Sequence, residues 1–167
     1  MRVTLLIMLV VLILSTAVAA DAPQSGASLA GLRLYDLSGK RQSLDEVKTR
    51  CVVIVWWAFW CDTWKKALPE ITDLAARQEE LDCTVWTVSI DGRCTAEIKP
   101  LVGQGKIHFP VLLDDGTWTK KLGLRRVPTV TILDEKRQIV YLREVYPGND
   151  KLEKALREIK RTKQAHD

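Results

Sequence analysis

The sequence has little histidine and no motif that is typical of metal, nucleotide or serine-hydrolase chemistry. Its two histidines, His108 and His166, lack the spacing of metal ligands, and its four cysteines lack the paired spacing of a zinc site. There is no phosphate-binding loop and no Ser/His/Asp signature. We therefore expect neither a metal nor another cofactor. Internal repeats and low-complexity tracts are also absent, as is typical of a globular domain.

Length and charge indicate one domain without a nucleic-acid partner. The chain has 167 residues and a net charge of +4, so its basic excess is modest. Acidic residues alternate with the basic ones near the C-terminus, which favours a solvated helix face over a patch for nucleic acid or membrane. The basic residues there are Lys151, Lys154, Arg157, Lys160, Arg161 and Lys163.

The first 20 residues have the parts of a secretory signal peptide. Arg2 supplies a positive charge, residues 3–14 are apolar, and small residues at 17–20 precede Asp21. We predict cleavage just before Asp21 or one residue earlier, and a periplasmic or extracellular location. An uncleaved membrane anchor is the alternative, because residues 15–20 nearly extend the run to the ~20 residues that a spanning helix needs.

The mature part is predicted to contain a linker and one α/β domain. Residues 21–28, with Pro23 and Gly26, read as a linker, and residues 29–167 form the domain. Leu32 to Leu37 ends in the turn signal Ser38-Gly39, which predicts a hairpin arm. A capping box predicts a short helix from Ser43.

Two apolar runs predict buried strands. Cys51 to Phe59 is continuous, β-branched and aromatic, and Thr84 to Ile90 is similar. Helical periodicity follows each of them, and strands that alternate with helices indicate a central sheet covered by helices. The later predicted elements are a helix at Thr95 to Val102, a strand at Phe109 to Leu113, a helix at Trp118 to Leu122, strands at Thr129 to Leu133 and Ile139 to Val145, and a last helix capped by Asn149 or Asp150.

Two motifs resemble those of thioredoxin-like proteins of the exported TlpA/ResA type. The segment from Trp57 to Glu70 reads W-A-F-W-C-D-T-W-K-K-A-L-P-E, and Val127-Pro128-Thr129 occurs downstream. In that family the first motif holds the active-site cysteine and the second is a cis-proline loop that faces it. The resemblance implies a thioredoxin fold, a central mixed sheet flanked by helices with an N-terminal β-hairpin arm, and a thiol–disulfide oxidoreductase.

The first motif departs from the family pattern at the position that matters for redox chemistry. Trp64 occupies the place of the second cysteine, Asp62 stands where a proline is frequent, and Ala67 replaces a carboxylate that many members have. The family pattern is kept at Trp60, Cys61 and Pro128. The dithiol mechanism of the family therefore does not carry over unchanged.

Cys61 is the candidate attacking thiol. It lies where a buried strand ends and a helix begins, and a helix N-terminus stabilises anions. We predict a moderately lowered thiol pKa, opposed by Asp62 and supported by Lys65 and Lys66. A buried structural thiol is the alternative interpretation.

A mixed disulfide at Cys61 needs a second thiol to resolve it, and Trp64 has none. Cys94 is one candidate, because in this fold its strand lies parallel to and beside the strand that leads to Cys61. A disulfide needs Cα atoms about 4.4–6.8 Å apart, so the loop must bring Cys94 to that distance. An external thiol is the second option, and the absence of turnover is the third.

Cys51 and Cys83 are placed at the beginnings of the same two strands. Neighbouring strands are about 4.8 Å apart, so a structural disulfide is geometrically feasible if the register brings the two residues together. Two buried thiols are the alternative.

Four residues are candidates for substrate binding: Trp60, Trp64, Val127 and Pro128. Trp60 and Trp64 are spaced i, i+4 and would form an apolar surface around the thiol, or pack against the helix instead. A cis Pro128 would leave neighbouring backbone available to pair with an extended substrate segment. Arg125 precedes this loop and is compatible with an acidic partner or with a solvated loop.

The functional hypothesis is an exported thiol–disulfide oxidoreductase that acts on cysteines of other exported proteins or on a redox partner protein. The alternative is a non-catalytic thioredoxin-fold binding or scaffold protein. A peroxide-reducing enzyme is disfavoured, because the Pro, Thr and Cys pattern of peroxiredoxins does not precede Cys61.

Overall fold

The computed structural model describes residues 26–92 and 95–164. The predicted signal peptide and most of the predicted linker lie outside these residues, as does Cys94. Within them, one mixed sheet has the strands β1 (Arg33–Asp36), β2 (Arg41–Ser43), β3 (Cys51–Trp57), β4 (Cys83–Ser89), β5 (Val111–Leu113), β6 (Thr129–Leu133) and β7 (Ile139–Glu144). The helices are η1 (Leu44–Glu46), α2 (Asp62–Ala76), α3 (Ile98–Gly103), α4 (Thr117–Lys121) and α5 (Asn149–Gln164).

The seven strands follow the order β2-β1-β5-β4-β3-β6-β7. Strand β3 lies in the interior of the sheet, parallel to β4 on one side and antiparallel to β6 on the other. Because β3, β4 and β5 run in the same direction, their carboxyl ends meet at one rim of the sheet and their amino ends at the opposite rim. We call these the C-terminal rim and the N-terminal rim.

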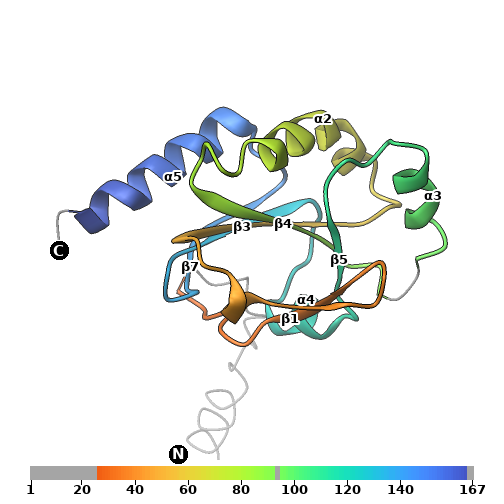
Figure 1. Ribbon diagram of the computed structural model, residues 1–167, viewed down its shortest axis with the longest axis horizontal. Coiled ribbons are helices and arrows are strands. Elements are labelled where there is room, and N and C mark those ends of the chain that lie inside the picture. The colour runs from red at the N-terminus through yellow and green to blue at the C-terminus, as the bar shows by residue number, and fades with distance from the viewer. Residues whose placement is uncertain (1–25, 93–94, 165–167) are drawn as a thin grey trace, which may run out of the picture.

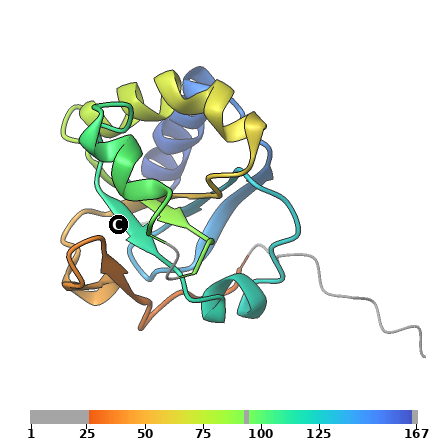
Figure 2. The same cartoon turned by 90° about the vertical axis from the view of Figure 1, so that its right-hand side faces the viewer.

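Helices cover both faces of the sheet. Helices α2 and α5 lie side by side over one face, and α4 lies on the other (Figures 1 and 2). Strand β3 is buried along its whole length, which explains why its sequence is a continuous apolar run rather than an alternating one. Trp56 and Trp57 point to opposite faces and belong to the two separate cores.

The hairpin arm forms as predicted and extends the sheet. Strand β1 pairs with β2 in antiparallel register and then with β5. The arm contributes Leu34 and Leu44 to the core between the sheet and α4. Mixed strand directions, helices on both faces and the arm together confirm the predicted fold class. Among the described residues, no helix has both the length and the apolar character needed to cross a bilayer.

Two local expectations differ in detail. Ser43 is the N-cap of the short helix η1, but its side chain makes no capping hydrogen bond, so the predicted capping box is not formed. Helix α3 begins at Ile98 rather than at Thr95. Pro100 falls within its first turn, where a backbone N–H has no helical partner and proline is tolerated.

Candidate active site at the C-terminal rim

Cys61 lies at the junction of β3 and α2 on the C-terminal rim. It is the N-cap residue of α2, with extended backbone angles of −86° and 113°. Its backbone N–H donates to the Ala58 carbonyl at 3.1 Å, which closes the turn between strand and helix. The residue is half-buried and packs at the edge of the core under α2. The residue is therefore not fully buried, which disfavours the interpretation of Cys61 as a buried structural thiol.

The proline loop faces this thiol. The Cys61 Sγ donates a hydrogen bond to the Val127 carbonyl at 3.1 Å, across 66 residues of sequence. The Val127-Pro128 peptide bond is cis, and the Val145 N–H donates to the Pro128 carbonyl at 2.8 Å. The structure thus brings Cys61 and Val127 into contact, whereas Pro128 itself is buried and anchored to the chain after β7.

Trp64 is buried, so its expected role on an exposed surface around the thiol is wrong. Its exposed fraction is 1%, and its ring lies 4.1 Å from that of Trp57 with the planes tilted by 50°. Trp64 lies at the start of α2, and its side chain points inward against β3. It does not lie along the surface with Trp60, four residues earlier. The indole N–H groups of both tryptophans are buried without a hydrogen-bond partner among the described residues. Apolar packing, not hydrogen bonding, holds this pair in place.

Trp60 has the opposite environment. Its exposed fraction is 61%, which makes it one of the large exposed apolar side chains of the described chain. It directly precedes Cys61 in the sequence, so an exposed apolar ring lies next to the residue that carries the thiol. Trp60 is thus well placed for the substrate contact expected of it, while Trp64 is not.

Charged residues on the first turn of α2 pair with each other. Lys65 Nζ lies 2.8 Å from Asp62 Oδ1, and both side chains are mostly exposed. The hydrogen bond from Lys65 is the main cause that lowers the pKa of the Asp62 carboxyl, with the charge of Lys66 a smaller one. Asp62 is therefore an anion beside Cys61, and Lys65 neutralises that anion instead of standing free for the thiol.

Asp91 is a site residue that sequence reasoning missed. Its Oδ2 accepts hydrogen bonds from the Phe59 backbone N–H at 2.9 Å and from the Ser89 hydroxyl at 2.7 Å. These bonds tie the end of β4 to the loop that carries Cys61. The only sequence signal is its place directly after the predicted strand that ends at Ile90.

The two other cysteines that the structure describes lie far from Cys61 in the sheet. Cys51 and Cys83 lie at the N-terminal rim, at the starts of β3 and β4. Cys94 lies outside the described residues, so its pairing with Cys61 stays a prediction. The described residues that flank this gap are Gly92 and Thr95, and Asp91, just before Gly92, is bound to the Cys61 loop.

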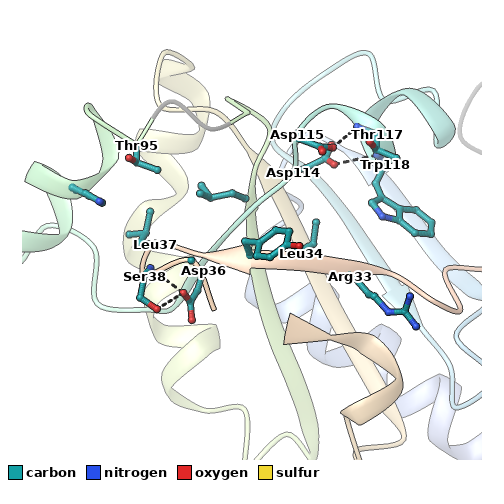
Figure 3. A pocket seen from close by; sticks show the side chains of 14 residues that line it. Arg33, Leu34, Asp36, Leu37, Ser38, Thr95, Asp114, Asp115, Thr117 and Trp118 are labelled. Atoms are coloured by element: carbon teal, nitrogen blue, oxygen red, sulfur yellow. Dashed lines mark hydrogen bonds between the residues drawn. The ribbon is translucent and has the colours of Figure 1, made fainter. Parts of the chain in front are cut away.

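A cavity of about 650 Å³ lies two strands away from the thiol, between the hairpin arm and the β5–α4 connection (Figure 3). The acidic side chains that line it hold local structure. Asp36 accepts from the Ser38 N–H and hydroxyl, and Asp114 accepts from the Trp118 N–H. Figure 3 shows these carboxylates turned toward their own loops. The cavity therefore contributes no reactive group to the site.

Residues 19–142, more than half of the chain, match the model of the AhpC/TSA family. The chain belongs to the AhpC/TSA family. Within it, the TlpA/ResA-type resemblance is confirmed by curated relatives. The chain is 28% identical over 120 residues to the thiol-disulfide oxidoreductase ResA of Bacillus cereus, which covers 70% of this chain and 68% of the relative. It is 26% identical over 117 residues to the thioredoxin-like protein YneN of Bacillus subtilis, covering 68% and 67%.

Solved structures of other proteins share the fold. The exposed lipoprotein thioredoxin of Streptococcus pneumoniae has a TM-score of 0.68 and 27% identity, and the match covers 77% of this chain and 99% of that chain. StoA from Bacillus subtilis has a TM-score of 0.65 at 20% identity, covering 77% and 98%, which supports the fold alone. Cys61 of this AhpC/TSA member thus lies in a thioredoxin fold, at the position that the motif predicted.

Proposed function

We propose that the protein is an exported thiol–disulfide oxidoreductase that works through a single motif cysteine, Cys61. The observation that carries this proposal is the geometry of its thiol. Cys61 is half-buried at a helix N-cap, and its Sγ contacts the Val127 carbonyl of the facing loop. Disulfide exchange needs a thiol that is accessible and positioned at an electrostatically favourable helix start.

Val127 offers a docking edge for an extended substrate segment. Its carbonyl reaches the Cys61 thiol, and no hydrogen bond among the described residues uses its N–H. A substrate strand that pairs with this backbone brings its own cysteine to Cys61, in the manner of β-augmentation. The exposed Trp60 ring provides apolar contact beside it. We propose cysteines of other exported proteins, or of a redox partner protein, as the substrates.

The first chemical step is an attack on a substrate disulfide. The Cys61 thiolate forms a bond to one substrate sulfur, the substrate S–S bond breaks, and the other substrate sulfur leaves as a thiolate. The substrate is then held in a mixed disulfide. A second thiolate must attack Cys61 Sγ to release the first substrate sulfur as a thiol.

The source of that second thiol decides between two versions of the enzyme. Trp64 fills the position of the second motif cysteine with a buried indole, so the motif itself supplies none. Cys94 remains the internal candidate, supported by the hydrogen bond that ties Asp91 to the Cys61 loop. In this version the product is a Cys61–Cys94 disulfide. An external thiol, such as glutathione, is the other version, and a second external thiol then restores the Cys61 thiol.

A binding protein without turnover is the second candidate function. The burial of Trp64 favours it, because a mixed disulfide at Cys61 then persists unless another thiol reaches it. Such a protein would hold a partner covalently or through the surface around Trp60.

Reduction of a disulfide substrate tests these proposals. We would measure it with dithiothreitol and with glutathione for the wild type, Cys61→Ser and Cys94→Ser. We expect activity in the wild type and its loss in Cys61→Ser. Additional loss in Cys94→Ser supports the internal pair, and full activity in Cys94→Ser supports the external thiol.

Trapping experiments separate the binding protein from the enzyme. If the wild type shows no turnover but forms a mixed disulfide that Cys61→Ser does not form, the binding function is correct. If Cys61→Ser retains the activity of the wild type, neither function of Cys61 is correct. A surface-matched control is Thr63→Ser, which alters an exposed residue of the same turn without removing a thiol.

A further inference from the structure

The N-terminal rim holds a second pair of thiols that the chemistry of Cys61 does not use. Cys51 is the first residue of β3 and Cys83 is the first residue of β4. The parallel register places these two residues directly opposite each other. Both side chains belong to the core under α2 and α5, so they project from the same face of the sheet. Both are thiols in this structure, with exposed fractions of 2% each.

This register satisfies the distance condition for a disulfide. Residues that face each other on neighbouring strands are separated by about 4.8 Å, and disulfide-bonded Cα atoms are about 4.4–6.8 Å apart. Both cysteines stand at strand ends, where only one side of each residue is held in the ladder. We propose that Cys51 and Cys83 are a second redox site, which forms an intramolecular disulfide when the chain folds under oxidising conditions.

The last part of α5 covers this rim. Lys160 Nζ donates to the Leu81 carbonyl at 2.5 Å and lies 3.3 Å from Asp82 Oδ2, so it ties the helix to the chain just before β4. Ile159 and Lys160 border a small cavity beside Cys51. Burial raises the pKa of the Cys83 thiol to about 11, and the charge of Lys160 opposes this rise. In the folded protein the pair is therefore shielded from solvent and the Cys83 thiol is mostly protonated, so the reaction belongs to the folding chain.

The oxidant is a disulfide, either a small one such as oxidised glutathione or that of a disulfide-donating oxidoreductase. The thiolate of one cysteine attacks the oxidant and forms a mixed disulfide, and one oxidant sulfur leaves as a thiolate. The second cysteine then attacks its partner's sulfur, forms the Cys51–Cys83 bond and releases the other oxidant sulfur. Two protons and two electrons pass from the cysteine pair to the oxidant, which becomes two thiols.

The bond would enclose the segment that presents Cys61. The chain between the two cysteines contains β3, the Cys61 loop and α2. A crosslink that closes this unit restricts the unfolded chain and leaves the C-terminal rim unchanged. The Cys51–Cys83 disulfide thus stabilises the segment that positions Cys61, without taking part in the exchange reaction of Cys61.

The test uses the protein with Cys61→Ser and Cys94→Ser, so that Cys51 and Cys83 are the only thiols. It is unfolded, reduced, and refolded in a glutathione buffer of oxidised and reduced forms. We expect a product lighter by two hydrogen atoms and a Cys51–Cys83 crosslink in the peptide map. We also expect its Tm to exceed that of the reduced form by about 10 °C. Cys51→Ala and Cys83→Ala in the same background serve as controls that cannot form the bond.

A folded product in which both thiols still react with an alkylating reagent after denaturation would overturn the proposal. So would separate adducts of glutathione on Cys51 and Cys83, because they show that oxidation occurs without pairing. Incubation of the folded, reduced protein in the same buffer tests the shielding by α5. We expect disulfide formation there to be roughly 100-fold slower than during refolding, and equal rates contradict the assignment to the folding chain. None of these outcomes depends on whether Cys61 is catalytic.

Discussion

The two rims of the sheet carry the same kind of residue in two different environments. At the C-terminal rim, Cys61 is half-buried at a helix N-cap and contacts a loop from another part of the chain. At the N-terminal rim, Cys51 and Cys83 are buried beneath α5. The difference teaches that the fold, not the residue type, decides which sulfur can exchange. One rim ends in a turn that opens to solvent, and the other is closed by a helix.

The largest expected effect is the contrast in thiol reactivity between the rims. In a Cys94→Ser background at neutral pH, we expect an alkylating reagent to label Cys61 roughly 300-fold faster than Cys83 in the reduced, folded protein. A thiol with a pKa near 11 has few thiolates at that pH, and burial restricts access further. Mass mapping of labelled peptides over time measures both rates. Equal rates would remove the distinction between the rims.

The next effect concerns the tryptophan that replaces the second motif cysteine. Trp64→Ala leaves a large cavity against Trp57, and we expect the free energy of unfolding to fall by about 3–5 kcal/mol. Denaturant unfolding measures it. The matched control is Trp60→Ala, whose ring is exposed, and we expect a change within about 0.5 kcal/mol there. Similar losses in both variants would mean that Trp64 is not a core residue.

The sequence predicted the backbone elements that position Cys61 better than it predicted the side-chain contacts around them. The apolar run of β3, the helix start at Cys61 and the proline loop were all visible, because local pattern and family motifs report them. The orientation of Trp64 was left open, because an i, i+4 spacing does not tell which of two residues faces the core. Asp91 was missed because its contact with Phe59 joins residues 32 positions apart. The register of Cys51 and Cys83 likewise depends on strand pairing, which one chain's pattern does not fix.

A pH-dependent effect on stability is expected at the N-terminal rim. Burial raises the pKa of Cys83 from 9.0 to about 11 in the folded protein. Below pH 9 both states keep the proton. Between pH 9 and 11 the unfolded chain loses it while the folded protein retains it, so stability falls as pH rises. The loss reaches about 2–3 kcal/mol by pH 11 and then levels off.

The measurement is denaturant unfolding of reduced protein across this range, with Cys83→Ala as the control. Because lysines and tyrosines also titrate there, the informative quantity is the difference between the two proteins. We expect the wild type to lose stability more steeply. Parallel curves would show that the thiol is not desolvated. The oxidised Cys51–Cys83 form has no proton to lose and should follow the control.

A smaller effect is expected where Asp91 anchors the Cys61 loop. Asp91→Ala leaves the Phe59 N–H and the buried Ser89 hydroxyl without their acceptor, so unfolding free energy should fall by about 1–2 kcal/mol. Asp91→Asn keeps an acceptor oxygen and should recover part of this loss. If Asp91 positions the loop, Asp91→Ala should also change the rate at which Cys61 is alkylated, whereas Asp91→Asn should change it less. An unchanged rate in both variants would limit Asp91 to a role in stability.

The smallest effect is expected at the exposed charges beside Cys61. Asp62→Asn removes a negative charge next to the thiol, which favours the thiolate. It also releases the positively charged Lys65 from its 2.8 Å ion pair. Both changes act in the same direction, yet the groups are exposed and water screens them. We expect alkylation of Cys61 to become faster by about threefold at low salt, and the gain to disappear at about 1 M salt, where the Debye length is about 3 Å.

The charge-matched control is Glu79→Gln, which removes an exposed carboxylate beyond the far end of α2 and should leave the rate unchanged. A large gain that survives high salt would show that Asp62 acts on the thiol through a direct contact, and the C-terminal rim would then be less open to solvent than its burial indicates.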